Sequence, residues 1–276
     1  MADSSVTVTQ NDFAQTPLSS VYTPFYAKII DNVFTPAECA SLVSLAASCP
    51  DGWKPAGLST GAAEQTVHSN FRNSDRVLVF NTAEAEKIYA KLWPYVEEIY
   101  EIPPGGRWGC ITGKVGKKQG PTWTLAGVNP RLSFLRYGPG QYFKPHCDGL
   151  VEVGSQKSFV TLHLYLNDSS SSSLPISPAA ASSPALSSSL PSPSSNYIGP
   201  FESTTSLHAP EASTSTSPLQ GGATRFWTPD KKAYLDVFPK LGRVLVFQQR
   251  MLVHSGEEVT SGVKYTMRSD FMFNQK

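Results

Sequence analysis

The sequence has little that would place the chain at a membrane or on a nucleic acid. None of its 276 residues belong to an apolar run long enough to cross a bilayer. Lysine and arginine number 23 against 22 acidic residues, so the basic surplus typical of proteins that neutralise phosphates is missing. The first residues are polar and lack a basic flank followed by an apolar stretch, which predicts no secretory signal. We therefore expect a cytoplasmic or nuclear protein with no nucleic-acid or membrane partner.

Cysteine is also scarce. The four cysteines contain no Cys-x-x-Cys pair, which argues against a zinc ribbon and against a disulfide-framed secreted domain. Apolar residues make up 40% of the chain, enough to build a core. The composition is that of a globular domain whose function must come from particular side chains.

One long stretch, residues 169–220, is almost without charge. It opens with five consecutive serines and continues with serine, proline, alanine and threonine. Such a composition cannot bury enough apolar surface to offset the entropy of ordering it, so we expect a disordered insertion. The flanks at 159–166 and 221–227 are strand-like, and loop-closure entropy grows only slowly with loop length. The prediction is an N-terminal tail over residues 1–24 and one domain formed by residues 25–168 and 221–276.

Helical patterns are confined to the first half. Thr35, Pro36 and Glu38 form a capping box with proline at the first helical position. A second helix is predicted from Asn81, kinked or split at Pro94. Short strands separated by turn signals are then predicted at residues 132–137, 142–146, 159–166, 224–227, 243–248 and 264–273. This order indicates an α+β, mainly β fold, in which N-terminal helices support an antiparallel sandwich or barrel.

Metal-binding residue types occur in or beside these predicted strands. His146 and Asp148 are two positions apart, so in an extended segment both side chains point the same way, although His-x-Asp alone is a weak signal. His254 follows one predicted strand and Lys264 opens the next. Two histidines and one carboxylate on one face of an ion, with the other positions open, suit non-haem Fe(II) oxygen chemistry. A dianionic 2-oxo acid on that ion leaves one negative charge, which a buried Lys264 would cancel.

These segments together resemble the prolyl 4-hydroxylase-like branch of the 2-oxoglutarate and Fe(II)-dependent dioxygenases. The resemblance rests on segments that occur in the family's order, at residues 136–149, 160–167, 221–226, 239–247 and 254–264. It implies a double-stranded β-helix, which is a jelly-roll-like fold. It also implies bound Fe(II), 2-oxoglutarate and O2 as co-substrates, and ascorbate as a reductant. The implied reaction is hydroxylation of an unactivated C–H of a prolyl or other residue in a protein or peptide.

The resemblance assigns the metal and co-substrate roles residue by residue. His146, Asp148 and His254 match the catalytic iron ligands. Lys264 matches the basic residue that pairs with the distal carboxylate of 2-oxoglutarate. Arg268 lies on the same face of the predicted strand and could replace or assist Lys264.

Four further residues are candidate contacts. Tyr137 and Tyr165 match aromatic positions that line the co-substrate pocket, with core filling as the alternative for each. Arg76 and Trp227 are predicted substrate contacts, and a surface salt-bridge loop is the alternative for Arg76. His163 lies in an apolar strand and is predicted to be a packed core histidine.

The sequence leaves rival functions open. A small-molecule oxygenase of secondary metabolism has the same metal site, and a non-catalytic module that senses the metal or 2-oxoglutarate could keep the fold without turnover. A nucleic-acid demethylase of the AlkB type is disfavoured, because Phe271 stands where such proteins carry a second arginine and the net charge is only +1. The oligomeric state is not predicted.

Overall fold

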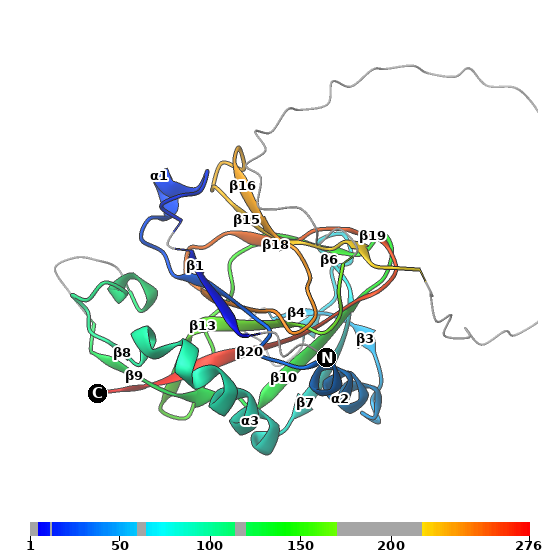
Figure 1. The fold of residues 1–276 in the computed structure, drawn as a ribbon, viewed down its shortest axis with the longest axis horizontal. Coiled ribbons are helices and arrows are strands. Elements are labelled where there is room, and N and C mark those ends of the chain that lie inside the picture. The colour runs from blue at the N-terminus through cyan, green and yellow to red at the C-terminus, as the bar shows by residue number, and fades with distance from the viewer. Residues whose placement is uncertain (1–4, 12, 60–64, 114–119, 170–216) are drawn as a thin grey trace, which may run out of the picture.

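Two antiparallel sheets face each other in the computed structural model. It describes residues 5–11, 13–59, 65–113, 120–169 and 217–276, so most of the predicted insertion lies outside the described residues. Over these residues strands dominate and helices are few, which confirms the mainly β class. Figure 1 shows the smaller sheet on one side of the larger one and the two long helices on the other side.

The larger sheet has eleven strands among the described residues. They are β1 (Thr7–Asn11), β2 (Ala27–Asp31), β3 (Lys54–Pro55), β7 (Asp75–Phe80), β8 (Glu101–Ile102), β9 (Trp123–Val128), β10 (Arg131–Tyr137), β12 (Glu152–Val153), β13 (Gln156–Tyr165), β17 (Val244–Gln248) and β20 (Lys264–Gln275). Their order is β1-β2-β17-β13-β20-β10-β7-β3, with β12 beside β13 and the β8–β9 pair beside β20.

The smaller sheet has the order β16-β15-β18-β11-β6. Its strands are β6 (Arg72–Asn73), β11 (Tyr142–His146), β15 (Thr224–Trp227), β16 (Tyr234–Val237) and β18 (His254–Gly256). Two short pairs complete the strands, β4 (Leu58–Ser59) with β5 (Gln65–Thr66) and β14 (Gln220–Gly221) with β19 (Val259–Ser261).

Both predicted helices are confirmed, and their ends follow from the predicted capping residues. Helix α2 (Pro36–Ala47) begins at a capping box, in which the Glu38 N–H donates to Thr35 Oγ1 over 3.3 Å and the Thr35 N–H donates to the Glu38 carboxylate over 2.9 Å. Helix α3 (Thr82–Leu92) is capped by the Asn81 side chain and ends just before Pro94.

The remaining helical segments are short. They are α1 (Ser19–Tyr22) and the 3-10 turns η1 (Trp93–Tyr95), η2 (Glu97–Ile99) and η3 (Gly109–Ile111). Among the described helices, none is long and apolar enough to span a membrane.

Side chains alternate between the two faces of the larger sheet, so the sheet separates two hydrophobic cores. Phe134, Leu162 and Val246 belong to the core beneath α2 and α3, whereas Leu245 and Phe247 belong to the core between the sheets. The inner face of β13 and β20 also carries polar side chains, which are Thr161, His163, Lys264, Arg268 and Asp270. Polar groups between two sheets require partners, so this face is where a functional site is expected.

The described N-terminal residues pack on the domain, whereas the sequence predicted a tail over residues 1–24. Strand β1 pairs with β2 at the edge of the larger sheet. Phe13, Leu18 and Tyr22 are buried in the core between the sheets, and the Phe13 ring lies 5.6 Å from the ring of Phe226. The described part of residues 1–24 therefore belongs to the domain, because three large apolar side chains in an otherwise polar stretch find space there.

We expect Phe13→Ala to lower the free energy of unfolding by about 3–5 kcal/mol, because it removes a fully buried aromatic ring and leaves a cavity. Chemical denaturation of the full chain measures this change. Val8→Ala is the control, since Val8 is exposed on β1 and its truncation should change stability by less than about 0.5 kcal/mol. Equal effects of the two substitutions would contradict the packing of this segment.

Candidate metal centre and its pocket

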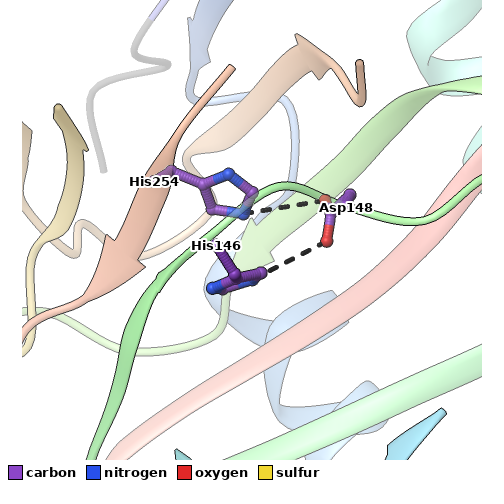
Figure 2. A group of neighbouring side chains, drawn as sticks. All are labelled: His146, Asp148 and His254. Atoms are coloured by element: carbon purple, nitrogen blue, oxygen red, sulfur yellow. Dashed lines mark ion pairs between the residues drawn. The ribbon is translucent and has the colours of Figure 1, made fainter. Parts of the chain in front are cut away.

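Three predicted ligands meet at the end of the smaller sheet. His146 on β11 and His254 on β18 are direct cross-strand partners, which brings their ring centroids to 4.4 Å. Asp148 follows β11, with Oδ1 3.8 Å from His146 Nε2 and Oδ2 3.7 Å from His254 Nε2 (Figure 2). One donor atom from each residue lies within 4.8 Å of the others. The structure therefore places this trio around one point.

Both imidazoles are oriented by backbone carbonyls. His146 Nδ1 lies 2.8 Å from the Lys144 carbonyl oxygen, and His254 Nδ1 lies 3.1 Å from that of Leu252. Because a carbonyl can only accept, each Nδ1 carries the proton and each Nε2 presents a lone pair toward Asp148. Burial lowers the pKa of both rings, that of His146 to about 3 with help from the neighbouring His254. The rings are therefore neutral at neutral pH, as metal binding requires.

Asp148 is held from the larger sheet. Thr161 on β13 donates to Oδ2 over 2.6 Å, and the Arg268 guanidinium on β20 lies 3.0 Å from Oδ1. Burial raises the pKa of Asp148, but Arg268 and the two histidines outweigh burial and hold it well below the ordinary range. The carboxylate is thus ionised and fixed between the two sheets.

The donor set fits an octahedral first-row ion better than a closed tetrahedral one. Two neutral imidazoles and one carboxylate supply three donors from one side, which is the arrangement of non-haem Fe(II) oxygenase sites. A closed structural zinc site needs a fourth protein ligand, usually cysteine or histidine. The nearby Cys147 side chain is exposed and is not part of the cluster of potential ligands. The remaining positions of an ion at this site would face the pocket.

A pocket extends from the trio between the sheets. Its polar wall is formed by Arg72, His163, Thr224, Ser255, Lys264 and Arg268, and its apolar wall includes Leu135, Phe143 and Phe247. The pocket therefore combines cationic groups with a mostly water-excluding surround, which suits an anionic ligand.

Lys264 is a buried cation without a carboxylate partner in the described part of the chain. Its side chain is 2% exposed, and Nζ donates to the Gly222 carbonyl oxygen over 2.6 Å. The rings of Tyr137 and Tyr165 lie 5.0 and 5.8 Å from Nζ. Burial lowers the pKa of Lys264 to about 7, although Glu257 opposes the shift. Gly222 permits this placement, because a Cβ there would lie 2.9 Å from Lys264 Cδ.

Orphaned polar atoms on the pocket wall also indicate a polar ligand. His163 Nε2 and Arg268 Nε are buried and have no hydrogen-bond partner among the described residues. An unsatisfied buried group of this kind costs about 1–3 kcal/mol. His163 was predicted to be a packed core histidine, whereas the structure puts it on the pocket wall. Together with Lys264, these atoms fit a dianionic co-substrate such as 2-oxoglutarate.

The other predicted co-substrate contacts are placed differently. Tyr137 is buried on the pocket wall. Tyr165 is fully buried behind Thr224, and its hydroxyl lies 2.6 Å from Thr224 Oγ1, so the core-filling alternative describes it better. Arg268 pairs with Asp148 and, more distantly, with Asp270. That pairing favours Lys264 as the partner of the distal carboxylate.

The two predicted substrate contacts do not line this pocket. Arg76 donates to the Gly57 carbonyl oxygen over 3.4 Å and lines a neighbouring pocket beside Lys54. Trp227 donates from its indole N–H to Ser255 Oγ over 2.7 Å. It therefore contacts a residue of the pocket wall but does not line the pocket itself. Arg72 lines the pocket instead. The sequence offered no signal for Arg72 beyond its position four residues before Arg76.

No protein-family model and no curated protein match the chain. Among solved structures, a Pseudomonas putida prolyl-4-hydroxylase matches with a TM-score of 0.50 and 14% identity, covering 95% of this chain and 95% of that chain. The chain has the fold of that protein. This confirms the expected double-stranded β-helix, and the chain carries a candidate His-Asp-His metal triad.

Two further structures match at lower TM-scores. A viral collagen prolyl hydroxylase from Paramecium Bursaria Chlorella virus-1, in a 2OG complex, has a TM-score of 0.44 and 20% identity, covering 90% of this chain and 96% of that chain. A Trichoplax adhaerens prolyl hydroxylase in complex with a hypoxia inducible factor peptide fragment has a TM-score of 0.47 and 14% identity, covering 89% and 82%.

We expect Thr161→Val to weaken divalent metal binding by about 10- to 100-fold, because it removes the hydroxyl that orients Asp148. Titration with Co(II), followed by its visible absorption, measures the affinity. Thr266→Val is the matched control, since Thr266 is equally buried on β20 but its hydroxyl has no partner in the described structure. Wild-type affinity in Thr161→Val would contradict this role, and Asp148→Ala should abolish binding.

Proposed function

We propose that the protein is a 2-oxoglutarate- and Fe(II)-dependent dioxygenase that hydroxylates an unactivated C–H. The observation that carries the proposal is the shared pocket. His146, Asp148 and His254 line the same cavity as the buried Lys264, which pairs with no carboxylate of the described residues. A metal trio alone would suit several chemistries. A cation deeper in the same pocket adds a place for the far end of a dicarboxylate.

Each residue has a separable task in this proposal. His146, Asp148 and His254 hold one face of the ion and leave its other positions open to the pocket. When bound, Fe(II) supplies the dioxygen activation that couples oxidative decarboxylation of 2-oxoglutarate to C–H hydroxylation. Thr161 and Arg268 keep the Asp148 carboxylate in one orientation.

Lys264 selects the co-substrate in this proposal. Its ammonium binds the distal carboxylate of 2-oxoglutarate, and the Gly222 carbonyl oxygen and the Tyr137 ring hold the ammonium in place. The apolar wall at Phe143 and Phe247 keeps water from the reacting groups. Ascorbate as a reductant follows from the resemblance alone.

The substrate is proposed to be a prolyl or other residue of a protein or peptide, which the fold shared with a prolyl-4-hydroxylase supports. A free small molecule is the alternative. The test uses the full chain with Fe(II), 2-oxoglutarate, ascorbate and O2, and measures succinate release with proline-rich peptides and with small molecules. His146→Ala should release no succinate, whereas Thr266→Val should behave as wild type. A protein that binds the ion and 2-oxoglutarate but converts no candidate would instead be a sensor module.

Lys264→Met should raise the dissociation constant for 2-oxoglutarate by about 30-fold or more, because it leaves a buried carboxylate unpaired. Anaerobic calorimetry with the Fe(II)-loaded protein measures this. Lys157→Met, on β13 but outside the pocket, is the control and should bind as wild type. An unchanged constant in Lys264→Met, with a large loss in Arg268→Met, would transfer the role to Arg268.

The affinity for 2-oxoglutarate should fall as the pH rises above about 7. Lys264 in the free protein has a pKa of about 7, and a bound dianion raises that pKa. Above pH 7 the free protein must take up a proton to bind, so the affinity falls by up to about tenfold per pH unit until the pKa of the complex is reached. Calorimetry from about pH 6 to about pH 9 should show this slope in wild type and not in Lys264→Met, which has the same metal ligands. Parallel profiles would contradict the assignment.

A further inference from the structure

Arg72 brings a second cation to the pocket from the smaller sheet. Strand β6 pairs with β11, so that Arg72 lies opposite Phe143. The guanidinium lies 4.6 Å from the centroid of the Phe143 ring, and that ring stacks on His146 with centroids 3.6 Å apart. Arg72 is therefore one aromatic ring away from a metal ligand, and it lines the same pocket.

The hydrogen-bond partners of Arg72 among the described residues are neutral. Its Nε donates to Ser74 Oγ over 3.3 Å, and Tyr137 is a further hydrogen-bond partner. No carboxylate among the described residues lies within ion-pair distance of it. Three other partly buried arginines each pair with an aspartate: Arg136 with Asp75, Arg225 with Asp236, and Arg243 with Asp31. Arg72 differs from these three in having no aspartate or glutamate partner among the described residues.

The sum of the charges at the site, with an ion and the co-substrate bound, also leaves Arg72 without a balancing charge among the described residues. The two positive charges of the ion and that of Lys264 cancel Asp148 and a dianionic co-substrate. Arg268 is balanced by its second partner, Asp270. In this sum Arg72 carries a positive charge on the pocket wall that no carboxylate of the described residues pairs with. A partly buried, uncompensated guanidinium is costly, and a carboxylate matches its planar fork with two parallel hydrogen bonds.

We propose that the substrate carries a carboxylate, which Arg72 binds beside the metal centre. This rests on the proposed function, and it narrows the substrate class. The favoured substrates present an acid close to the reacting carbon, either as a free carboxylic acid or as an acidic side chain or C-terminus in a peptide. An uncharged proline-rich segment would leave Arg72 unpaired.

The test compares acids with their matched amides on the full chain loaded with Mn(II) and 2-oxoglutarate, which does not turn over. One arm uses N-acetyl amino acids against their primary amides, and the other uses blocked peptides that differ only by Asp against Asn. Calorimetry gives the affinities, and the relaxation of probe protons by Mn(II) reports whether a probe binds near the ion. The first arm identifies free acids as the source, and the second identifies peptide side chains.

In wild type we expect at least one acid to bind near the ion about tenfold or more tighter than its amide. Arg72→Gln should remove that preference, Arg72→Lys should keep part of it, and Arg250→Gln, outside the pocket, should keep all of it. The dissociation constant for 2-oxoglutarate should stay the same in all of these variants.

Two results overturn the proposal. One is equal binding of acid and amide across both arms. The other is a loss of 2-oxoglutarate binding in Arg72→Gln comparable with that in Lys264→Met, which would make Arg72 a co-substrate residue. Both leave the proposed function standing, because the protein still binds Mn(II) and 2-oxoglutarate. Wild-type protein that fails to bind 2-oxoglutarate would count against the proposed function itself.

Discussion

The position of one carboxylate ties the two sheets together at the site. Asp148 follows a strand of the smaller sheet, yet one of its oxygens accepts a hydrogen bond from Thr161 and the other forms an ion pair with Arg268, both on the larger sheet. A buried carboxylate without such partners would take up a proton and lose its value as a ligand. The packing of the two sheets therefore sets both the orientation and the charge of Asp148, and the two histidines depend on it for a third donor.

The three cations that line the pocket, Arg72, Lys264 and Arg268, differ in the partners that they have. Arg268 pairs with two carboxylates, so its charge is balanced within the protein. Lys264 contacts a backbone carbonyl and aromatic rings, and Arg72 has neutral hydrogen-bond partners in the part of the chain that the structure describes. Lys264 and Arg72 line the pocket from different sheets, and the proposals above give each of them a different anionic group to bind. The pocket is suited to anions because two of its three cations lack a carboxylate partner among the described residues, and not because of the number of cations alone.

Local sequence patterns predicted most of the features that depend on residues close together in the chain. The capping box at Thr35 and the break at Pro94 set the helix ends, and strand spacing put His146 and Asp148 on one side. Contacts between strands that are far apart in the chain could not be predicted from such local patterns. Tyr165 turned out to be core, and Arg72 rather than Arg76 lines the pocket, because the pairing of β6 with β11 decides which arginine reaches it. Likewise, the buried Phe13 could not be recognised without knowing the space that receives it.

The site also tolerates the long interruption of the chain for a geometric reason. Ser169 and Leu219 form a bridge, so the described ends of the interruption lie side by side. The chain then enters Gly222, whose positive φ and missing Cβ leave room for the Lys264 side chain. The bridge at Leu219 lies three residues before Gly222, so it fixes where the chain approaches that glycine. The glycine turn therefore helps to place the Lys264 ammonium, because its carbonyl oxygen accepts from Nζ and its missing Cβ leaves room for the side chain.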